Sequence, residues 1–358
     1  MALLVLWGFA IYFCNQDTIS TSVSIINPSS DQMQSEIQEI FDNRNKAILE
    51  EDVNFLNNLY NRKVRNGLFA YEHELKKMKY LNRWAHKQSV TFSKIDSKVF
   101  LRNVKKKGDG YSVALAVSTE YEYEYNNSTV SNNSFRLGTY HSLDLIPNQG
   151  SWMITKEWYI DPFADSLDID KMNIEKINQI ISSSKGEELS NLNARRLAAL
   201  DYVDKYCGVA RPPDYSFHYN KNYRNYNSVG GDCANFASQM IFEGSFKKNY
   251  TWNYQGGKAS KAWINAHSFN SYMLYSGRGS LIQKGTYEQV LKNSYKLLPG
   301  DYIAYEKKGK VAHISVVSGI DSLGYALVNS HNTDRFRVPW DLGWSNEGIK
   351  FWLVHVNY

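Results

Sequence analysis

The chain has little cysteine and little proline. Its 358 residues include 3 Cys and 7 Pro. So few cysteines exclude a small disulfide-stapled scaffold, and no CxxC or Cys/His spacing typical of a zinc site occurs. With 22% charged and 43% hydrophobic residues, the composition also excludes a collagen-like or wholly disordered chain. The sequence also lacks the series of long apolar runs that a multi-span membrane protein needs. At about 150 residues per domain, the length predicts two or three globular domains.

The net charge of +5 is unevenly distributed. Residues 193–358 carry a net charge of +8, whereas residues 1–192 carry −3. A basic C-terminal half indicates a polyanionic partner such as an anionic bacterial wall polymer, and a mildly basic solvated surface is an equal alternative. Because Lys and Arg form no dense cluster, we do not expect nucleic acid as a partner.

The N-terminal segment is apolar without interruption over residues 1–13 (MALLVLWGFAIYF). It is too short to span a bilayer, which takes about 20 residues, and it fits the core of a signal peptide that lacks a basic start. A polar tether follows, so residues 1–30 are interpreted as a signal or anchor remnant. We expect an exported protein, extracellular or tethered to a membrane through this segment alone. The alternative is a cytosolic protein with an unusual N-terminus.

Residues 31–165 show helical patterns followed by strand patterns. Apolar residues at helical spacing predict helices over 31–62 and 71–87. From 89 to 160, β-branched and aromatic segments alternate with turn residues, which predicts about five strands. This is an α+β accessory domain, with a helix packed on a curved antiparallel sheet. Its element order resembles the nuclear-transport-factor-2-like (NTF2-like) fold. A polar helical linker over 166–192 follows.

Residues 193–358 have a different pattern. A helix at the start of this region, a Tyr/Asn-rich loop and a second, Cys-bearing helix precede short strands over 297–358. A helix that carries Cys, followed by a small sheet that carries His, is the element order of papain-like folds.

The segment GGDCANFASQ (230–239) is the most informative. Gly230 and Gly231 permit a sharp turn, Asp232 suits a helix N-cap, and Cys233 then occupies the first helical position. Unpaired N–H groups at a helix N-terminus favour the thiolate and can form half of an oxyanion hole. The chemistry predicted for Cys233 is nucleophilic, and the alternative is a small buried hydrophobe.

A thiolate nucleophile needs a base, and the base needs an orienting partner. His313 begins the predicted strand KVAHISVVSGI and is the predicted base. The next strand, YALVNSHNTDR, offers Asn329 and His331, which share one face by the period of two. Sequence does not choose between them as the group that orients His313.

Other residues complete the predicted site. Asn227 and Gln239 are candidate donors or supports for the oxyanion, and Trp263 and Trp344 are candidate walls of a substrate cleft. Cys207 either forms a disulfide with Cys233 or leaves both thiols free.

Six segments resemble, in order and spacing, the bacterial putative amidase domain family, which looks like a relative of the papain-like CHAP and NlpC/P60 cysteine amidases. They are NARRLAALDYVDKYCG, GGDCANFASQMIFEG, SKAW, LLPGDYIAY, HISVVSG and NSHNTDR. The resemblance covers about 193–358. It implies a Cys233–His313 pair with Asn329 or His331 as third member, and hydrolysis of amide bonds in peptidoglycan or a similar peptide. Two departures are Ala234, where Thr is frequent, and NSHNTD, where a His-Thr pair is usual.

The implied reaction proceeds through a thioester and needs no metal or organic cofactor. Three alternatives stay open: a non-catalytic wall-binding or adhesive module, a disulfide-locked inactive domain, and a transamidase that passes the acyl group to an amine.

Overall fold

A computed structural model describes residues 29–126, 132–163, 172–187, 189–344 and 348–358. The apolar segment at 1–13 and Cys14 lie outside these residues. Within the described ranges, no helix combines the length and apolar character needed to cross a bilayer.

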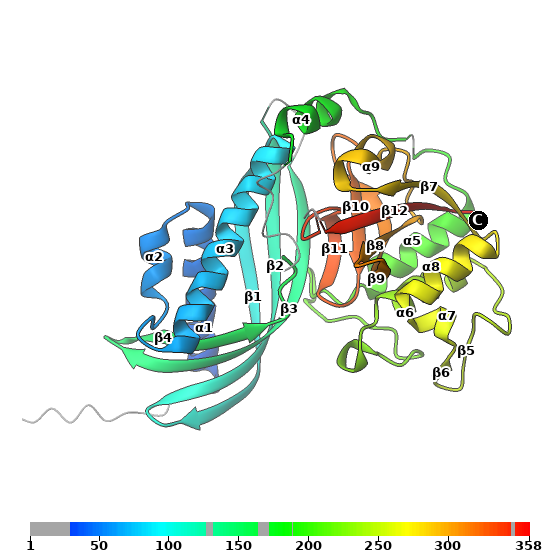
Figure 1. The fold of residues 1–358 in the computed structure, drawn as a ribbon. Helices are drawn as coiled ribbons and strands as arrows, with labels where there is room; N and C mark the ends of the chain where they lie inside the picture. Colours follow the sequence, from blue (N-terminus) through cyan, green and yellow to red (C-terminus); the bar gives the residue numbers. More distant parts are fainter. Residues whose placement is uncertain (1–28, 127–131, 164–171, 188, 345–347) are drawn as a thin grey trace, which may run out of the picture.

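The N-terminal half places helices on one face of a long, curved sheet (Figure 1). The helices pack through buried stripes at helical spacing, such as Ile37 and Phe41 of the first helix. The predicted helix over 31–62 is two helices, because Glu51 adopts a left-handed φ of 57° and Asp52 caps a new start. The elements are α1 (Ser30–Leu49), α2 (Val53–Asn58), α3 (Arg65–Gln88), β1 (Val90–Lys107), β2 (Gly110–Tyr125), β3 (Asn133–Asn148) and β4 (Ser151–Tyr159).

The C-terminal half packs helices against shorter strands. Its first helices are α4 (Ile174–Ser183), α5 (Ala194–Tyr206) and α6 (Cys233–Glu243), with a 3-10 turn, η1 (Asn227–Val229), before α6. There follow β5 (Tyr254–Gln255), β6 (Lys258–Ala259), α7 (Lys261–Ile264), α8 (Ala266–Tyr275), β7 (Gly279–Gly285) and α9 (Tyr287–Ser294). The last strands are β8 (Tyr302–Lys307), β9 (Lys310–Ile320), β10 (Ala326–Ser330), β11 (Asp334–Pro339) and β12 (Ile349–Val356).

One sheet runs through both halves. Its strand order is β1-β2-β3-β11-β10-β9-β8-β12-β7, and β4 also pairs with β3. The halves join where β11 pairs antiparallel with β3, with Asp334 opposite Gly138. The fold is therefore α+β with antiparallel pairing, as predicted. This pairing also places residues of β3 and β4, such as Tyr140 and Trp158, near the loop that precedes α6.

A buried ion pair also links the halves. Lys87, at the end of α3, lies 2.5 Å from Asp341, which follows β11, and both side chains are fully buried. Trp84 Nε1 and the Tyr325 hydroxyl also donate to this carboxylate. The Asp341 carboxylate is therefore satisfied by three donors from both halves.

Replacing Asp341 by Ala is expected to lower the free energy of unfolding by about 3–5 kcal/mol, because the Lys87 ammonium would remain buried without its partner. Urea denaturation of the full chain measures this loss. The double variant Lys87→Met with Asp341→Leu removes both charges, and we expect it to lose much less than Asp341→Ala. Equal stability of Asp341→Ala and the unaltered protein would contradict the assigned role.

Candidate functional site

Cys233 begins α6, as predicted, and lies at the base of the loop that carries Gly230 and Gly231. Its side chain belongs to the core on the α6 face of the sheet, together with Ile314 and Val316 of β9. Burial raises the pKa of the Cys233 thiol to about 11, although backbone N–H groups of Ile314, Ala234 and Cys233 itself act in the opposite direction. The thiol is therefore protonated at neutral pH in this resting arrangement.

Asp232 and His331 form a buried pair beside this helix start. His331 Nδ1 lies 2.6 Å from Asp232 Oδ2, and Nε2 lies 2.7 Å from the carbonyl oxygen of Tyr206. Burial lowers the pKa of His331, but the hydrogen bond and charge of Asp232 outweigh it and raise the pKa above its ordinary value. Because both ring nitrogens face acceptors, the ring is held as an imidazolium. The ring of Phe236, one turn after Cys233, stacks on it with centroids 4.1 Å apart.

The carboxylate of Asp232 has a different role from the one its position suggests. Asp232 occupies the N-cap of α6, but its side chain makes no cap hydrogen bond. Instead Oδ1 accepts from the backbone N–H of Tyr226 and from Asn235 Nδ2, each at 2.8 Å. These contacts leave Oδ2 for His331 and fix the carboxylate in place, an arrangement that the N-cap pattern alone does not reveal.

Gly231 is required by the approach of the loop after β10. Its φ is 117°, and a Cβ built there would lie 2.2 Å from Asn332 Nδ2. Asn332 Oδ1 in turn accepts from the backbone N–H of Asp232 at 2.7 Å. The glycine therefore lets the loop that carries His331 dock directly on the residues before Cys233.

His313 does not meet the thiol, which corrects the predicted Cys233–His313 pair. Its ring packs against Tyr305, its partner on β8, and stacks on Trp344 with centroids 5.1 Å apart. Successive residues of a strand alternate in face, so His313 points away from the α6 face to which Ile314 turns. Burial, together with the charge of Arg335, lowers the pKa of His313 to about 3. An imidazole of that pKa is a very weak base.

Asn329 and His331 do not orient His313 either, because both are occupied elsewhere. Asn329 Oδ1 accepts from the Ser318 hydroxyl, and Asn329 Nδ2 donates to Asp204 Oδ1 at 2.9 Å. The Nε2 atom of His313 is buried without a hydrogen-bond partner in the described part of the chain. Across the same ranges, no hydrogen bond joins the Cys233 sulfur to His313 or to His331.

One predicted support, Gln239, and the two predicted cleft walls, Trp263 and Trp344, pack in or against the cores. Gln239 Oε1 accepts from the Tyr202 hydroxyl at 2.6 Å, which ties α6 to α5 away from the thiol. Trp263 is fully buried, and its Nε1 donates to Asn235 Oδ1 at 2.8 Å. Trp344 covers His313 and Tyr305. Trp344 is half-buried against the core, and neither Trp is among the described residues that line the cleft next to the start of α6.

The two described cysteines are free, so the predicted alternative of a Cys207–Cys233 disulfide is wrong in this structure. Cys207 ends α5, and its thiol contacts the carbonyl oxygen of Asp204 at 3.8 Å. Burial raises the pKa of Cys207 to about 12. Cys207 is thus the less acidic of the two thiols.

A cleft of about 300 Å³ opens where the two halves meet, next to the start of α6. Asn227, Gly230 and Gly231 line it from the α6 side. Asn227, the predicted oxyanion donor, is half-buried there, and its Oδ1 has no hydrogen-bond partner among the residues that the structure describes. The opposite wall comes from the N-terminal half and includes Trp158, which sequence reasoning missed because no local pattern connects a residue of β4 with Cys233.

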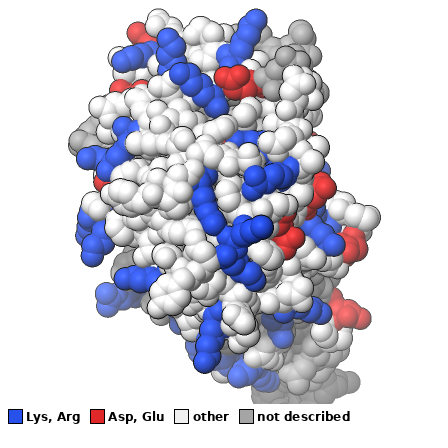
Figure 2. All heavy atoms as spheres, turned by 90° about the vertical axis from the view of Figure 1, so that its right-hand side faces the viewer, with Lys and Arg blue, Asp and Glu red and all other residues white. Residues whose placement is uncertain are grey.

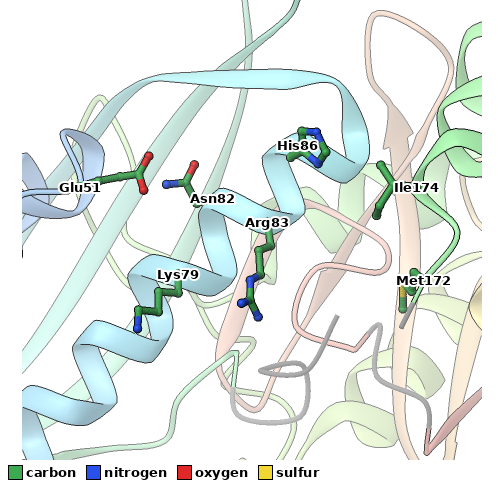
Figure 3. A pocket seen from close by; sticks show the side chains of 7 residues that line it. All are labelled: Glu51, Lys79, Asn82, Arg83, His86, Met172 and Ile174. Atoms are coloured by element: carbon green, nitrogen blue, oxygen red, sulfur yellow. The ribbon is translucent and has the colours of Figure 1, made fainter. Parts of the chain in front are cut away.

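A larger cavity of about 490 Å³ lies elsewhere, along α3 (Figure 3). Its lining is mostly polar: Lys79, Asn82, Arg83 and His86 come from α3, Glu51 lies on the side of Asn82, and Met172 and Ile174 lie at the other end. The side chains that line it include no Cys, Ser or Thr nucleophile. Size alone therefore does not identify the site. The smaller cleft is the candidate because Gly230 and Gly231, which line it, directly precede the helix start at Cys233, although the buried thiol itself is not part of the lining.

Comparison with protein families covers this same half of the chain. Residues 193–354 match the family described as "Putative amidase domain". The matched amidase region includes Cys233, His313 and His331. It supports a hydrolase of amide bonds at the coarse level.

A curated relative of part of this chain comes from Bacillus subtilis (strain 168). It is the "Uncharacterized protein YjcM", 27% identical over 169 residues that make up 44% of this chain and 36% of that protein. The chain thus aligns with only about a third of the relative's length.

Solved structures share limited likeness with about a third of the chain. The intermembrane space region of the chloroplast protein ARC6 gives a TM-score of 0.24 at 11% identity, covering 35% of this chain and 95% of that one. Kfla4162 from Kribbella flavida gives 0.25 at 9% identity, with coverage of 37% and 91%. A variant of the protein Rd1NTF2_05 gives 0.21 at 13% identity, with coverage of 37% and 99%. These scores carry no argument about function.

The outer face of the C-terminal half carries the charge expected from the sequence. Figure 2 shows more Lys and Arg than Asp and Glu side chains on this face. Exposed lysines of this half include Lys247, Lys258 and Lys296. A polyanionic partner stays a prediction.

Proposed function

We propose that this chain is a cysteine-dependent amide hydrolase that acts on amide bonds of bacterial peptidoglycan or of a similar peptide. Cys233 is the nucleophile, and His331, held by Asp232, is the acid–base group. The observation that carries the proposal is the position of the Cys233 thiol at a helix start, beside the buried Asp232–His331 pair and the cleft. A papain-like architecture is supported by the packing of α6 on β9 and β10. The family resemblance and the basic C-terminal half support the wall peptide as substrate.

The reaction starts from a thiol and an imidazolium. When substrate fills the cleft, the Cys233 thiol loses its proton to solvent, and the N–H groups at the start of α6 and the imidazolium stabilise the thiolate. The thiolate attacks the amide carbonyl and forms a C–S bond. The His331 imidazolium gives its proton to the nitrogen of the leaving amine as the C–N bond breaks. The neutral ring then takes a proton from water, which cleaves the thioester.

The negative oxygen of the tetrahedral intermediate needs two donors. The backbone N–H of Cys233 is one, and the amide of Asn227, which lines the cleft, is the other. In this mechanism the His331 ring must exchange the Tyr206 carbonyl for the reacting atoms, because Nε2 is bound to that oxygen in the resting site. The resting protein is therefore a closed form that substrate opens.

Purified peptidoglycan peptides test the proposal through the release of free amines by the full chain. Prior treatment with iodoacetamide is expected to abolish the release. The rate of inactivation should rise about tenfold per pH unit from pH 7 to 10, since the reactive thiolate fraction grows until pH reaches the thiol pKa of about 11.

Peptide mapping by mass spectrometry identifies the alkylated cysteine, and Cys207→Ala is the control protein. A chain that releases no amine, or that keeps full activity with Cys233 alkylated, is not a cysteine hydrolase. Retention on wall sacculi by such a chain would favour the non-catalytic binding module.

A further inference from the structure

The cleft beside Cys233 is built jointly by both halves of the chain. β11 pairs with β3, with Asp334 opposite Gly138 and Arg335 opposite Leu137. The N-terminal half supplies one wall through Gly138, Thr139, Tyr140, Trp158 and Ile160. The C-terminal half supplies the other through Asn227, Gly230, Gly231, Asn332, Thr333 and Asp334. The wall of the N-terminal half is thus held against the catalytic residues by main-chain pairing.

Three large apolar side chains of that wall are exposed to solvent. Trp158 is 61% exposed, Ile160 59% and Tyr140 48%. On β4, Glu157 next to Trp158 is directed inward, to the buried Arg44. The alternation of a strand therefore turns Trp158 outward, to the cleft. A folded domain gains nothing from large exposed apolar side chains gathered in one hollow, so such a group indicates a ligand.

A hydrogen bond and a ring contact connect this wall to the catalytic pair. The Tyr140 hydroxyl lies 3.2 Å from the Tyr219 hydroxyl. Tyr219 in turn donates to Asp334 Oδ2, and the Tyr219 ring contacts the ring of His331 with centroids 5.2 Å apart. An occupant that packs on Tyr140 is therefore linked to the acid–base group through one hydrogen bond and one ring contact.

The chemistry of the lining defines the occupant. No Lys or Arg is present among the described residues that line the cleft, and its one acid, Asp334, is buried and accepts from Tyr219. A charged side chain would find no partner there. Asn227, Asn332 and Thr333 offer amide and hydroxyl groups for peptide units, and the side chain of Trp158 offers a flat apolar surface. A volume of about 300 Å³ is at the lower end of ligand pockets, which suits a short peptide segment.

We propose that this cleft binds the part of the peptide substrate next to the scissile amide, with an uncharged aromatic or branched side chain packed on Trp158, Ile160 and Tyr140. The N-terminal half is then a determinant of substrate specificity. The assignment of the cleft to a substrate rests on the proposed function, but its binding chemistry can be measured without hydrolysis.

Binding to the full-length Cys233→Ala protein tests the proposal by calorimetric titration. The probes are acetyl-Ala-Phe-Gly-Gly amide and its counterpart with Lys in place of Phe. We expect the Phe probe to bind on the order of tenfold more tightly than the Lys probe, and Trp158→Ala to remove that preference. Phe55→Ala is the matched control, because Phe55 is an exposed aromatic residue of the same half, 39% exposed on α2, and does not line the cleft.

Three results would overturn the assignment: no measurable binding of the Phe probe, equal binding of the two probes, or equal effects of Trp158→Ala and Phe55→Ala. Thermal unfolding of each variant checks that the fold is intact. If the Phe preference depends on Trp158 but the protein with Cys233 hydrolyses no amide, the proposed hydrolase function fails and the cleft assignment stands. If the protein hydrolyses amides but Trp158 makes no contribution, the cleft assignment fails and the proposed hydrolase function stands.

Discussion

Replacing Cys233 by Ala is expected to reduce amide hydrolysis by at least about 10⁴-fold, because no other group of the site can form the thioester. The loss should appear in kcat, since the cleft that binds the peptide is unchanged. Single-turnover assays of amine release by the full chain measure it. Cys233→Ser gives a second reading, because a hydroxyl in the same place lacks the acidity of a thiol and should be nearly as inactive.

Cys207→Ala is the matched control for the loss of a buried thiol. Both thiols are free and buried, but Cys207 ends α5 and lies outside the helix start. We expect the Cys207 variant to keep activity within about threefold of the unaltered protein, with at most a modest loss of stability from the missing packing. Equal activity of the two alanine variants would refute Cys233 as the nucleophile.

Replacing His331 by Gln is expected to reduce kcat by about 10²–10⁴-fold, the usual contribution of a general acid–base group. His313→Phe keeps an aromatic ring between Tyr305 and Trp344 and removes only ring nitrogens, one of which has no partner. We expect less than about a tenfold change for this variant. The reverse order of effects would restore His313 as the base and require β9 to turn its other face toward the thiol.

The pH profile separates catalysis by His331 from a purely structural role. Asp232 raises the pKa of His331, and the imidazolium is lost as pH rises through that raised value. Because the Cys233 thiol of the free protein has a pKa of about 11, kcat/KM should rise with pH as thiolate forms and should level off once pH passes the pKa of His331. In Asp232→Asn the charge that raises the pKa is gone, and the levelling-off should move to lower pH. A levelling-off that stays in place would exclude His331 as the titrating acid.

Local features of the fold followed from the sequence with small errors. The helix that begins at Cys233 was predicted from two glycines, an acid and an apolar face, and α6 begins there. The α+β class followed from the order of helical and strand patterns. The break between α1 and α2 was missed because the apolar spacing continues past it, while the left-handed φ of Glu51 ends the helix.

The partners in the site were harder to predict, because they depend on which face of a strand meets α6. The strand pattern identified His313 as a strand residue but could not say that its side chain turns toward Tyr305 and Trp344. Asn329 and His331 were equivalent by the period of two. They differ in the structure because Asn329 bonds to Asp204 and Ser318, whereas the ring of His331 reaches Asp232.

The sequence by itself determined the position of a thiol at a helix start, the α+β class and the uneven charge of the halves, because these depend on residues close together along the chain. Only the tertiary structure decided that His331 rather than His313 lies beside that helix start and that Tyr140 and Trp158 form a wall of the cleft. The pairing of β3 with β11 joins strands about 200 residues apart. No local propensity encodes such a contact, since its energy comes from packing and main-chain hydrogen bonds that exist only once both halves have folded.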